Sequence, residues 1–371
     1  MSAKKKNPGP SLRSLAGLAG VSVSTVSRAL RNHATISAPV RRRLQAFARR
    51  HGYEANPLVA QVYAKARAGR GFGLLGTLAY VTAYETPDWW RRHPTLCGFH
   101  DGVVERARQM GLRVDEFWAH EPGLKGPRLT QILRTRGIGG VVLAPVPGRN
   151  AAGLFDWEHF SVALIGESVT IPRLHRAASN LRQVMQVALR ELTRLGYRRI
   201  GLALRRRYHS NTDFNLLSTF LLFQRDLRAA DRVPVQAPEN WTEEIFLAWF
   251  KRHRPDAVIG AVEAVRGWLA KAGYQCPRDI GLVSLDWNEG AKEFASVDQN
   301  PRAVGAAAVD LVMAQMRHNE HGIPETPLTV LVDSAWRPGR TVRRHGASWT
   351  PVFLADATAG EVQAGAAKRA P

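Results

Sequence analysis

Residues 11–31 carry the pattern that most narrows the folds open to this chain. Two sets of apolar residues, each spaced for one face of a helix, lie on either side of Gly20. Glycine tolerates the positive φ of a tight turn, and Ser22 can accept a hydrogen bond from the free N–H groups that open the second helix. Two short helices joined in this way form a helix-turn-helix. The first set is Leu12, Leu15, Ala16 and Ala19, and the second is Val23, Val26, Ala29 and Leu30.

The outward side of the second predicted helix combines short hydroxyl side chains with arginine. Hydroxyl groups and the N–H groups of a helix start bond phosphates, and an arginine can reach O6 and N7 of guanine in the major groove. The alternative is an ordinary helical hairpin with a solvated polar face. Turn, spacing and charge agree, so the pattern favours a DNA-recognition helix. Its outward residues are Ser22, Ser24, Thr25, Ser27, Arg28 and Arg31.

Positive charge is concentrated at the start of the chain. The 371 residues hold 52 Lys and Arg against 31 Asp and Glu, a formal net charge of +21. Residues 1–70 hold 14 of these cations and one acid, Glu54, which leaves +13 in the first fifth of the chain. A basic start on a body of nearly ordinary charge indicates a nucleic-acid module joined to another domain.

The start of the chain divides into three predicted segments. We expect residues 1–10 to be a disordered basic tail, residues 11–56 to be the helix-turn-helix domain, and residues 57–73 to be a hinge or linker that contains three glycines. A third helix is expected from about residue 38 to residue 51, with Ser37 as its cap and Pro39 in its first turn.

From residue 74 onward, short apolar runs alternate with amphipathic stretches. This alternation predicts parallel sheets flanked by helices, and the length suits two such lobes. Residues 346–371 are rich in Ala and Gly without periodicity, which predicts a disordered tail. We expect the first lobe at about 74–178 and 299–330, and the second at about 179–298 and 331–345.

Several motifs spread along the chain share the pattern of one family. At 19–30, 36–44 and 51–57 the sequence reads AGVSVSTVSRAL, ISAPVRRRL and HGYEANP. At 192–203, 277–286, 297–312 and 337–341 it reads LTRLGYRRIGLA, PRDIGLVSLD, VDQNPRAVGAAAVDLV and RPGRT. The first group resembles the DNA-binding headpiece of the lactose/galactose repressor family (LacI/GalR), and the second resembles the effector domain of that family. The resemblance covers about residues 11–345.

The resemblance implies a homodimer that binds a pseudo-palindromic operator in double-stranded DNA. In the family, the segment after the headpiece forms a hinge helix that wedges a Leu into the minor groove. The matching residue is Val62, next to Tyr63, and its smaller side chain leaves a simple tether as the alternative. By match to the family, Ser22, Thr25 and Ser27 would contact phosphates, and Val23, Ser24 and Arg28 would face base edges.

The resemblance also implies a ligand between two lobes like those of periplasmic sugar-binding proteins. Asp286 and Trp287 follow the apolar run at 280–285 and would lie at the carboxyl edge of a sheet, where such ligands bind. A carboxylate beside an indole suits a polyhydroxyl ligand, although a loop cap and a core tryptophan explain the pair equally well. Asp88 and Trp89 follow the first strand and are weaker candidates.

The clearest departure from the family is at one position. Early in the helix after Leu204, where the family usually has an Arg that binds ligand hydroxyls, this chain has Asn215. The class of ligand therefore stays open, and a sugar is the first expectation only because the family often senses sugars.

Other functions find little support in the sequence. The two cysteines, Cys97 and Cys276, lie far apart, and neither a secretory signal nor an apolar run of membrane-spanning length is present. His93, Cys97 and His100 have helical spacing, but we interpret them as helix surface rather than a metal site. No nucleophile–base motif, Gly-x-Ser-x-Gly motif or P-loop is present, so the sequence does not suggest an enzyme.

The sequence thus predicts a cytoplasmic, sequence-specific transcriptional regulator, a repressor rather than an activator, controlled by a sugar-like small molecule. Two alternatives remain open. One is a periplasmic-type binding protein without a DNA role, and the other is a DNA-binding regulator whose second domain is a scaffold that senses nothing.

Overall fold

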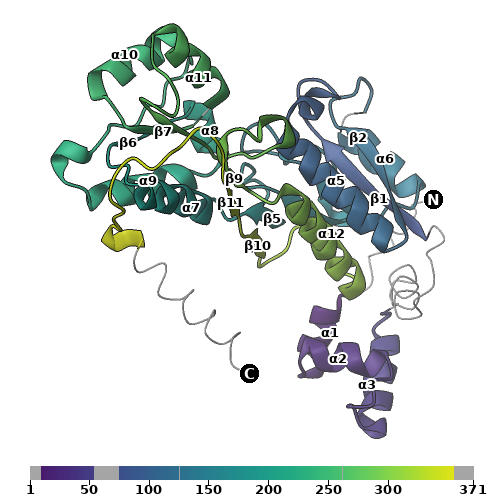
Figure 1. Ribbon diagram of the computed structural model, residues 1–371. Helices are drawn as coiled ribbons and strands as arrows, with labels where there is room; N and C mark the ends of the chain where they lie inside the picture. Colours follow the sequence, from purple (N-terminus) through teal and green to yellow (C-terminus); the bar gives the residue numbers. More distant parts are fainter. Residues whose placement is uncertain (1–9, 54–74, 125, 261, 355–371) are drawn as a thin grey trace.

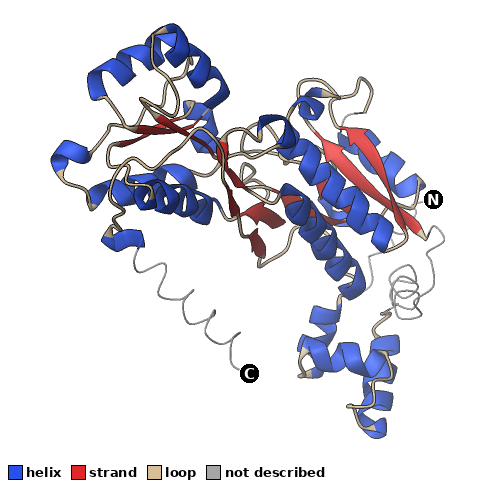
Figure 2. Cartoon of the chain, viewed as in Figure 1, coloured by secondary structure: helices blue, strands red, loops and turns tan. Residues whose placement is uncertain are grey.

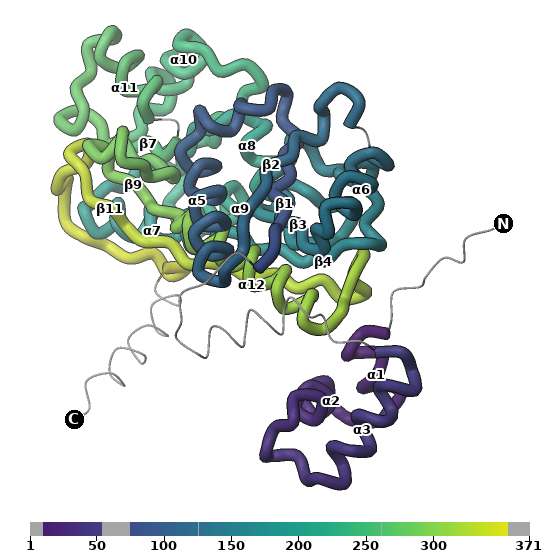
Figure 3. Tube along the Cα trace, turned by 90° about the vertical axis from the view of Figure 1, so that its right-hand side faces the viewer, coloured from purple at the N-terminus to yellow at the C-terminus, as the bar shows by residue number. Residues whose placement is uncertain are grey.

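A computed structural model of the chain describes residues 10–53, 75–124, 126–260 and 262–354. It has a helical N-terminal headpiece and two α/β lobes that lie side by side (Figure 1). The headpiece consists of α1 (Leu12–Ala19), α2 (Val23–Leu30) and α3 (Ala38–Arg50). Figure 3 shows it away from the sheets, next to the end of α12 (Pro301–His318). The predicted architecture, an all-α headpiece with a two-lobed α/β domain, is confirmed.

Lobe 1 is built on a six-stranded parallel sheet with the order β10-β5-β4-β3-β1-β2. Helices α5 (Pro94–Gln109) and α12 pack on one face, and α6 (Gly126–Thr135) packs on the other (Figure 2). The strands are β1 (Gly76–Thr82), β2 (Leu112–Trp118), β3 (Gly140–Leu143), β4 (Ser161–Ile165), β5 (His175–Ser179) and β10 (Thr329–Val332).

The side chains of β1 show why the lobe 1 sheet is covered on both faces. Leu78 and Tyr80 pack with α5 and α12, whereas Ala79 and Val81 pack on the α6 side. Successive side chains of a strand point to opposite faces, and all four are buried. A strand that is apolar on both faces must lie inside a sheet between two layers of helix.

Two glycines let α5 and α12 touch backbone to backbone. A Cβ atom on Gly102 would lie 2.0 Å from the carbonyl oxygen of Arg302, and one on Gly305 would lie 2.1 Å from the carbonyl oxygen of Phe99. Any side chain at these positions would force the helices apart. The close crossing fixes the start of α12, which returns from lobe 2, against lobe 1.

Lobe 2 has a five-stranded sheet with the order β11-β9-β8-β7-β6, in which only β11 runs antiparallel to its neighbour. Helices α7 (Leu181–Arg194) and α9 (Asn215–Arg225) cover one face, and α10 (Glu243–His253) and α11 (Val262–Lys271) cover the other. A short helix, α8 (Arg206–Asn211), precedes α9. The strands are β6 (Ile200–Ala203), β7 (Ala257–Gly260), β8 (Gly281–Ser284), β9 (Ala295–Asp298) and β11 (Ala335–Arg337).

The chain passes between the lobes three times, after β5, after β9 and after β10. The predicted boundaries at 178/179 and 330/331 fall inside β5 and β10, so the first and third crossings come slightly later than predicted. Because β5 and β10 pair with each other, these two crossings leave lobe 1 side by side.

The predicted disordered tail begins too early. The indole N–H of Trp349 donates to the Tyr197 carbonyl oxygen at 2.8 Å, and the Phe353 N–H donates to Asp226 Oδ2 at 2.9 Å. Leu354 is 0% exposed in the core that α7 and α9 share. Residues 346–354 therefore belong to lobe 2. The prediction failed because the low periodicity of this stretch hid a few side chains that pack without forming a regular element.

Replacing Leu354 with alanine is expected to destabilise lobe 2 by about 2 kcal/mol, the lower end for a buried leucine, since a chain end can relax into the space. Denaturant unfolding of the full chain measures this change. Val352, two residues earlier, is 69% exposed and provides the matched control, because Val352→Ala should leave stability unchanged. Equal stability of the two variants would show that the segment does not contribute to the core.

No helix among the described residues combines the length and the apolar character that a membrane crossing requires.

Candidate DNA-contacting surface and inter-lobe site

The turn between α1 and α2 has the predicted geometry. Gly20 ends α1 with φ +64°, in the left-handed region that favours glycine. Ser22 precedes α2, and its side chain accepts a hydrogen bond from the Thr25 N–H at 3.1 Å. Both features were expected from the sequence and are confirmed. Ser37 stands before α3 as predicted, but its side chain makes no capping hydrogen bond, and Pro39 occupies the first turn.

A small apolar core holds the three headpiece helices together. The buried residues come from all three helices, and a hydrogen bond from Gln45 Nε2 to the Ala29 carbonyl oxygen, 2.9 Å long, joins α3 to α2. This packing presents one side of α2 to the outside. The buried core residues are Leu12, Leu15, Ala16, Val26 and Ala48.

The exposed side of α2 contains most, but not all, of the predicted contact residues. Ser22, Ser24, Arg28 and Arg31 are exposed, and Val23 and Thr25 are partly buried. Ser27 is only 8% exposed and was wrongly placed on the outward face. Ser27 lies with Val26 on the inner side of the helix, whereas Arg28 is exposed. A small side chain at this position suits close packing with the other helices.

The arginines of α2 differ in how free they are. Arg31 bends back so that its Nε donates to the Ser27 carbonyl oxygen at 3.1 Å. Arg28 is exposed and forms no hydrogen bond or ion pair with any residue that the structure describes. Residues 10–53 hold eight arginines and no Asp or Glu. The headpiece is therefore cationic, and α2 exposes a guanidinium without a described partner, a combination that suits binding in a DNA groove.

The predicted hinge residues Val62 and Tyr63 lie outside the described residues.

The carboxyl ends of the parallel strands in the two lobes face each other, and side chains from the following loops meet there. Asp286, which follows β8 in lobe 2, accepts a hydrogen bond from the hydroxyl group of Thr95 at the start of α5 in lobe 1. Burial raises the pKa of the Asp286 carboxyl, and the Thr95 hydroxyl partly offsets that rise. Asp286 is thus a partly buried acceptor at the junction of the lobes, as its position after a strand predicted.

Trp287 has one face of its ring covered. The Arg337 guanidinium lies 5.0 Å from the ring centroid, and its Nη2 pairs with Asp298 Oδ2 at 2.7 Å. Asp298 is buried and holds this arginine in place. The indole is partly exposed rather than part of the core, so of its two predicted roles the core role does not hold.

The two residues predicted after β1 behave differently. The Trp89 ring stacks with the Tyr84 ring, at 4.9 Å between centroids, and with the His93 ring, at 3.9 Å. His93 lies close enough to lower the pKa of Asp286, so the stack leads towards the junction of the lobes. Asp88 is exposed and accepts a hydrogen bond from the Thr86 hydroxyl within its own loop.

Asn215 stands at the start of α9 and reaches across to lobe 1. Its Nδ2 donates to Glu167 Oε2 at 2.5 Å, and burial raises the pKa of that glutamate while the bond from Asn215 lowers it. Asn215, which was predicted to stand in the place of a ligand-binding arginine, therefore has a partner within the protein.

Three buried side chains near strand ends have no hydrogen-bond partner among the described residues. None of the three was predicted as a site residue from the sequence. They are the Tyr84 hydroxyl after β1, the Ser168 hydroxyl after β4 and both ring nitrogens of His209 after β6. Each is less than a tenth exposed. Buried polar groups normally have partners, so unpaired ones near a junction are candidates for ligand contacts. Their common position just beyond a strand was the available signal.

His93, Cys97 and His100 do not assemble. His93 lies before the first residue of α5, so it is not on the helix that carries the other two, and His100 pairs with Glu116 at 3.1 Å. Within the described ranges, no group of three or more His, Cys, Asp or Glu is arranged to hold a metal ion.

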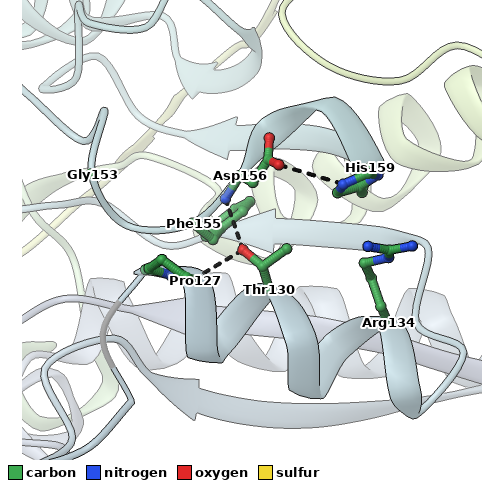
Figure 4. Close-up of a pocket in the computed structure, with 8 residues that line it drawn as sticks. Pro127, Thr130, Arg134, Gly153, Phe155, Asp156 and His159 are labelled. Atoms are coloured by element: carbon green, nitrogen blue, oxygen red, sulfur yellow. Dashed lines mark hydrogen bonds and ion pairs between the residues drawn. The ribbon is translucent and has the colours of Figure 1, made fainter. Parts of the chain in front are cut away.

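A separate hollow of about 370 Å³ lies on lobe 1 between α6 and the loop before β4 (Figure 4). The Thr130 hydroxyl, at its centre, donates to the Gly126 carbonyl oxygen at 3.0 Å and accepts from the Asp156 N–H at 2.9 Å. His159 pairs with Asp156 at 3.4 Å. Since its central polar groups are engaged with one another, this hollow is a weaker candidate than the junction of the lobes.

Two parts of the chain match known families. Residues 11–56 match the family described as bacterial regulatory proteins, lacI family, and residues 189–337 match the periplasmic binding protein-like domain. A search of curated proteins finds no match.

Solved structures share the fold at low sequence identity. A complex of the transcriptional regulator CelR with cellobiose is 18% identical, with a TM-score of 0.51, and the match covers 90% of this chain and 99% of that one. The lac repressor dimer bound to operator and the anti-inducer ONPF is 15% identical, with a TM-score of 0.53 and the same coverage. The LacI family regulator CCPA from Weissella paramesenteroides, with bound glucose, is 14% identical, with a TM-score of 0.52 and coverage of 72% and 98%.

Proposed function

We propose that this chain is a bacterial transcriptional regulator of the LacI type, as the matches of its headpiece and of residues 189–337 suggest. Two copies bind a pseudo-palindromic operator, and a small molecule between the lobes changes this binding. The observation that carries the proposal is the headpiece surface. A capped recognition helix exposes an unengaged Arg28 on a domain with eight arginines and no acid. The regulator would then act in the cytoplasm, where the DNA lies. Repression of transcription is its proposed effect.

The proposed contact residues of α2 and its cap have two kinds of role. Arg28 contacts a base edge together with Ser24 and the partly buried Val23, while Ser22 and Thr25 bond phosphates through their hydroxyl groups. Ser22 and Thr25 lie in the first turn of the helix, where free N–H groups add to phosphate binding. Ser27 is left out of the proposed contacts because it is buried.

The first test is selection of bound sequences from random double-stranded DNA by the full chain at near-physiological salt. A short palindrome among the selected sequences is the expected result, since a two-fold symmetric dimer reads two related half-sites. Binding to the palindrome should also weaken steeply as salt rises, because phosphate contacts release counterions. Enrichment of no sequence, with and without candidate effectors, would contradict a sequence-specific regulator.

The proposed effector site is the junction of the lobes around Asp286. The partly buried carboxylate, the partly exposed Trp287 and the unpaired groups of Tyr84 and His209 suit a ligand with several hydroxyl groups. Cellobiose and glucose occur in the related structures, and a sugar or sugar-like metabolite is the proposed ligand class here. Regulation rather than catalysis is the proposed role of this site.

Replacing Asp286 with alanine is expected to weaken effector binding by about ten- to a hundredfold, since a hydrogen bond to a charged group contributes about 1.5–3 kcal/mol. A thermal-shift screen with sugars, polyols and nucleobases first identifies a ligand that stabilises the chain. The ligand-induced rise in Tm should then be reduced in Asp286→Ala and retained in Glu289→Ala, a change at an exposed acid in the next turn. An unchanged rise in Asp286→Ala would place the ligand elsewhere.

A second candidate function follows from Asn215. Because its side chain bonds Glu167 in the other lobe, a domain that only dimerises and senses nothing is the alternative. A stabilising ligand in the same screen argues against it, and a selected operator without any such ligand supports it.

A further inference from the structure

Side chains of the two lobes bond each other directly beside the proposed effector site. Arg149, in the loop after β3 of lobe 1, pairs with Asp213 of lobe 2, with Nη2 and Oδ1 2.8 Å apart. Its Nη1 also donates to the Ser210 carbonyl oxygen at 3.3 Å. In the opposite direction, Asn215 of lobe 2 donates to Glu167 of lobe 1 at 2.5 Å. Both lobes therefore contribute a donor and an acceptor to the same contact.

All the lobe 2 partners lie within residues 210–215, which run from the end of α8 through a turn to the first residue of α9. Asp213 and Phe214 in this turn have φ values of +46° and +59°, a region that residues with side chains rarely adopt. Such a conformation persists where the surroundings determine it. Arg149 binds the turn at two points, and Asn215 anchors its end, so lobe 1 helps to fix a turn that lobe 2 alone would hold less firmly.

No single electrostatic interaction holds this contact together. Arg149 and Asp213 are each about half exposed, and a single exposed ion pair adds little. Glu167 is more buried, and among its charged neighbours the Asp213 carboxylate raises its pKa while the Arg176 guanidinium lowers it. Arg176 is held in place by a 2.8 Å bond to the Val169 carbonyl oxygen. The contact therefore depends on several bonds acting together rather than on one strong pair.

We propose that Arg149, Glu167, Asp213 and Asn215 form an inter-lobe latch that keeps the two lobes closed on each other before any effector binds. The bond between Thr95 and Asp286 crosses the same junction and adds to the closure. The latch concerns the regulation of the proposed effector site and rests on the proposed function to that extent. Opening the lobes to admit a ligand then breaks bonds that the chain already makes, so ligand binding is coupled to lobe movement.

The test measures the distance between the lobes in the full chain without ligand or DNA. Spin labels are attached through Gln131→Cys on lobe 1 and Arg225→Cys on lobe 2, in a background with Cys97→Ser and Cys276→Ser. Excess unlabelled chain ensures that most dimers carry one labelled protomer. A single narrow distance distribution is expected for this parent protein. Arg149→Ala combined with Asn215→Ala should lengthen and broaden it.

Two further variants separate the latch from general effects of mutation. Arg149→Asp should broaden the distribution by repulsion from Asp213, and adding Asp213→Arg should narrow it again because the pair is restored with reversed charges. Arg206→Ala removes an exposed ion pair with Glu239 inside lobe 2, 3.4 Å long, and should leave the parent distribution unchanged.

The latch is overturned if the parent protein and the variant with Arg149→Ala and Asn215→Ala have distance distributions of the same width, whether both are broad or both are narrow. Neither result depends on DNA or effector, so the latch can fail while an operator is found. Conversely, a failed operator selection leaves a narrow, latch-dependent distance intact.

Discussion

Replacing Arg28 with alanine is expected to remove most of the preference for the operator while leaving binding to other DNA nearly unchanged. A bidentate contact from arginine to guanine contributes about 1–3 kcal/mol of discrimination, so operator affinity should fall by about 5- to 150-fold. Binding to random DNA depends on the total cationic charge, of which Arg28 is one among eight arginines in residues 10–53. Titration of the selected operator and of a scrambled duplex at the same salt measures both affinities.

Arg50 provides the matched control, because it is exposed near the end of α3, also without a described partner. Arg50→Ala removes one charge but no base contact. It should therefore lower the affinity for both duplexes by the same small factor. If Arg28→Ala lowered the affinity for both duplexes equally, Arg28 would be a phosphate contact and the proposed contact with a base edge would be wrong.

Replacing Leu15 with alanine is expected to abolish operator binding without unfolding the lobes. Leu15 is 0% exposed and lies at the centre of the headpiece core. Removing a buried leucine side chain costs about 2–5 kcal/mol, which is comparable to the whole stability of a domain of this size. The recognition helix would then lose the surface on which it is held, because an isolated helix this short is not stable in water.

Circular dichroism during thermal unfolding should show the lobe transition at its original temperature, together with reduced helix content at the start. Leu18, on the same helix, is 64% exposed, and Leu18→Ala should change headpiece stability by no more than about 0.5 kcal/mol. Full operator affinity in Leu15→Ala would mean that the headpiece core does not hold the recognition helix.

The headpiece was predictable because its determinants are local. The positive φ at Gly20 and the cap at Ser22 depend on neighbours within a few residues, and both were found as expected. The error at Ser27 arose from helical geometry. A short polar side chain at the edge of the apolar stripe can face either way, and only the packing of α2 against its neighbours places it inside.

The lobes were predictable as a class but less so in detail. Alternating apolar runs and amphipathic stretches predicted the parallel sheets. The position of Asp286 was predicted because it directly follows a strand, at the carboxyl edge of a sheet. The contacts of Asn215 with Glu167 and of Arg149 with Asp213 join residues 48 and 64 positions apart. No sequence pattern encodes such pairs, because they exist only once two separately folded lobes meet.

The headpiece core is made entirely of residues between Leu12 and Tyr53, and the lobes supply none of its apolar side chains. Within the described residues, its contacts with lobe 1 include an ion pair between Arg13 and Glu320, 3.8 Å long. More than half of the Arg13 side chain is exposed. A domain that carries its own core can be cut out and joined to a foreign sensor. For circuit construction, the headpiece therefore offers an interchangeable DNA-binding part, and chimaeras joined between Tyr53 and Leu75 would leave both packing units intact.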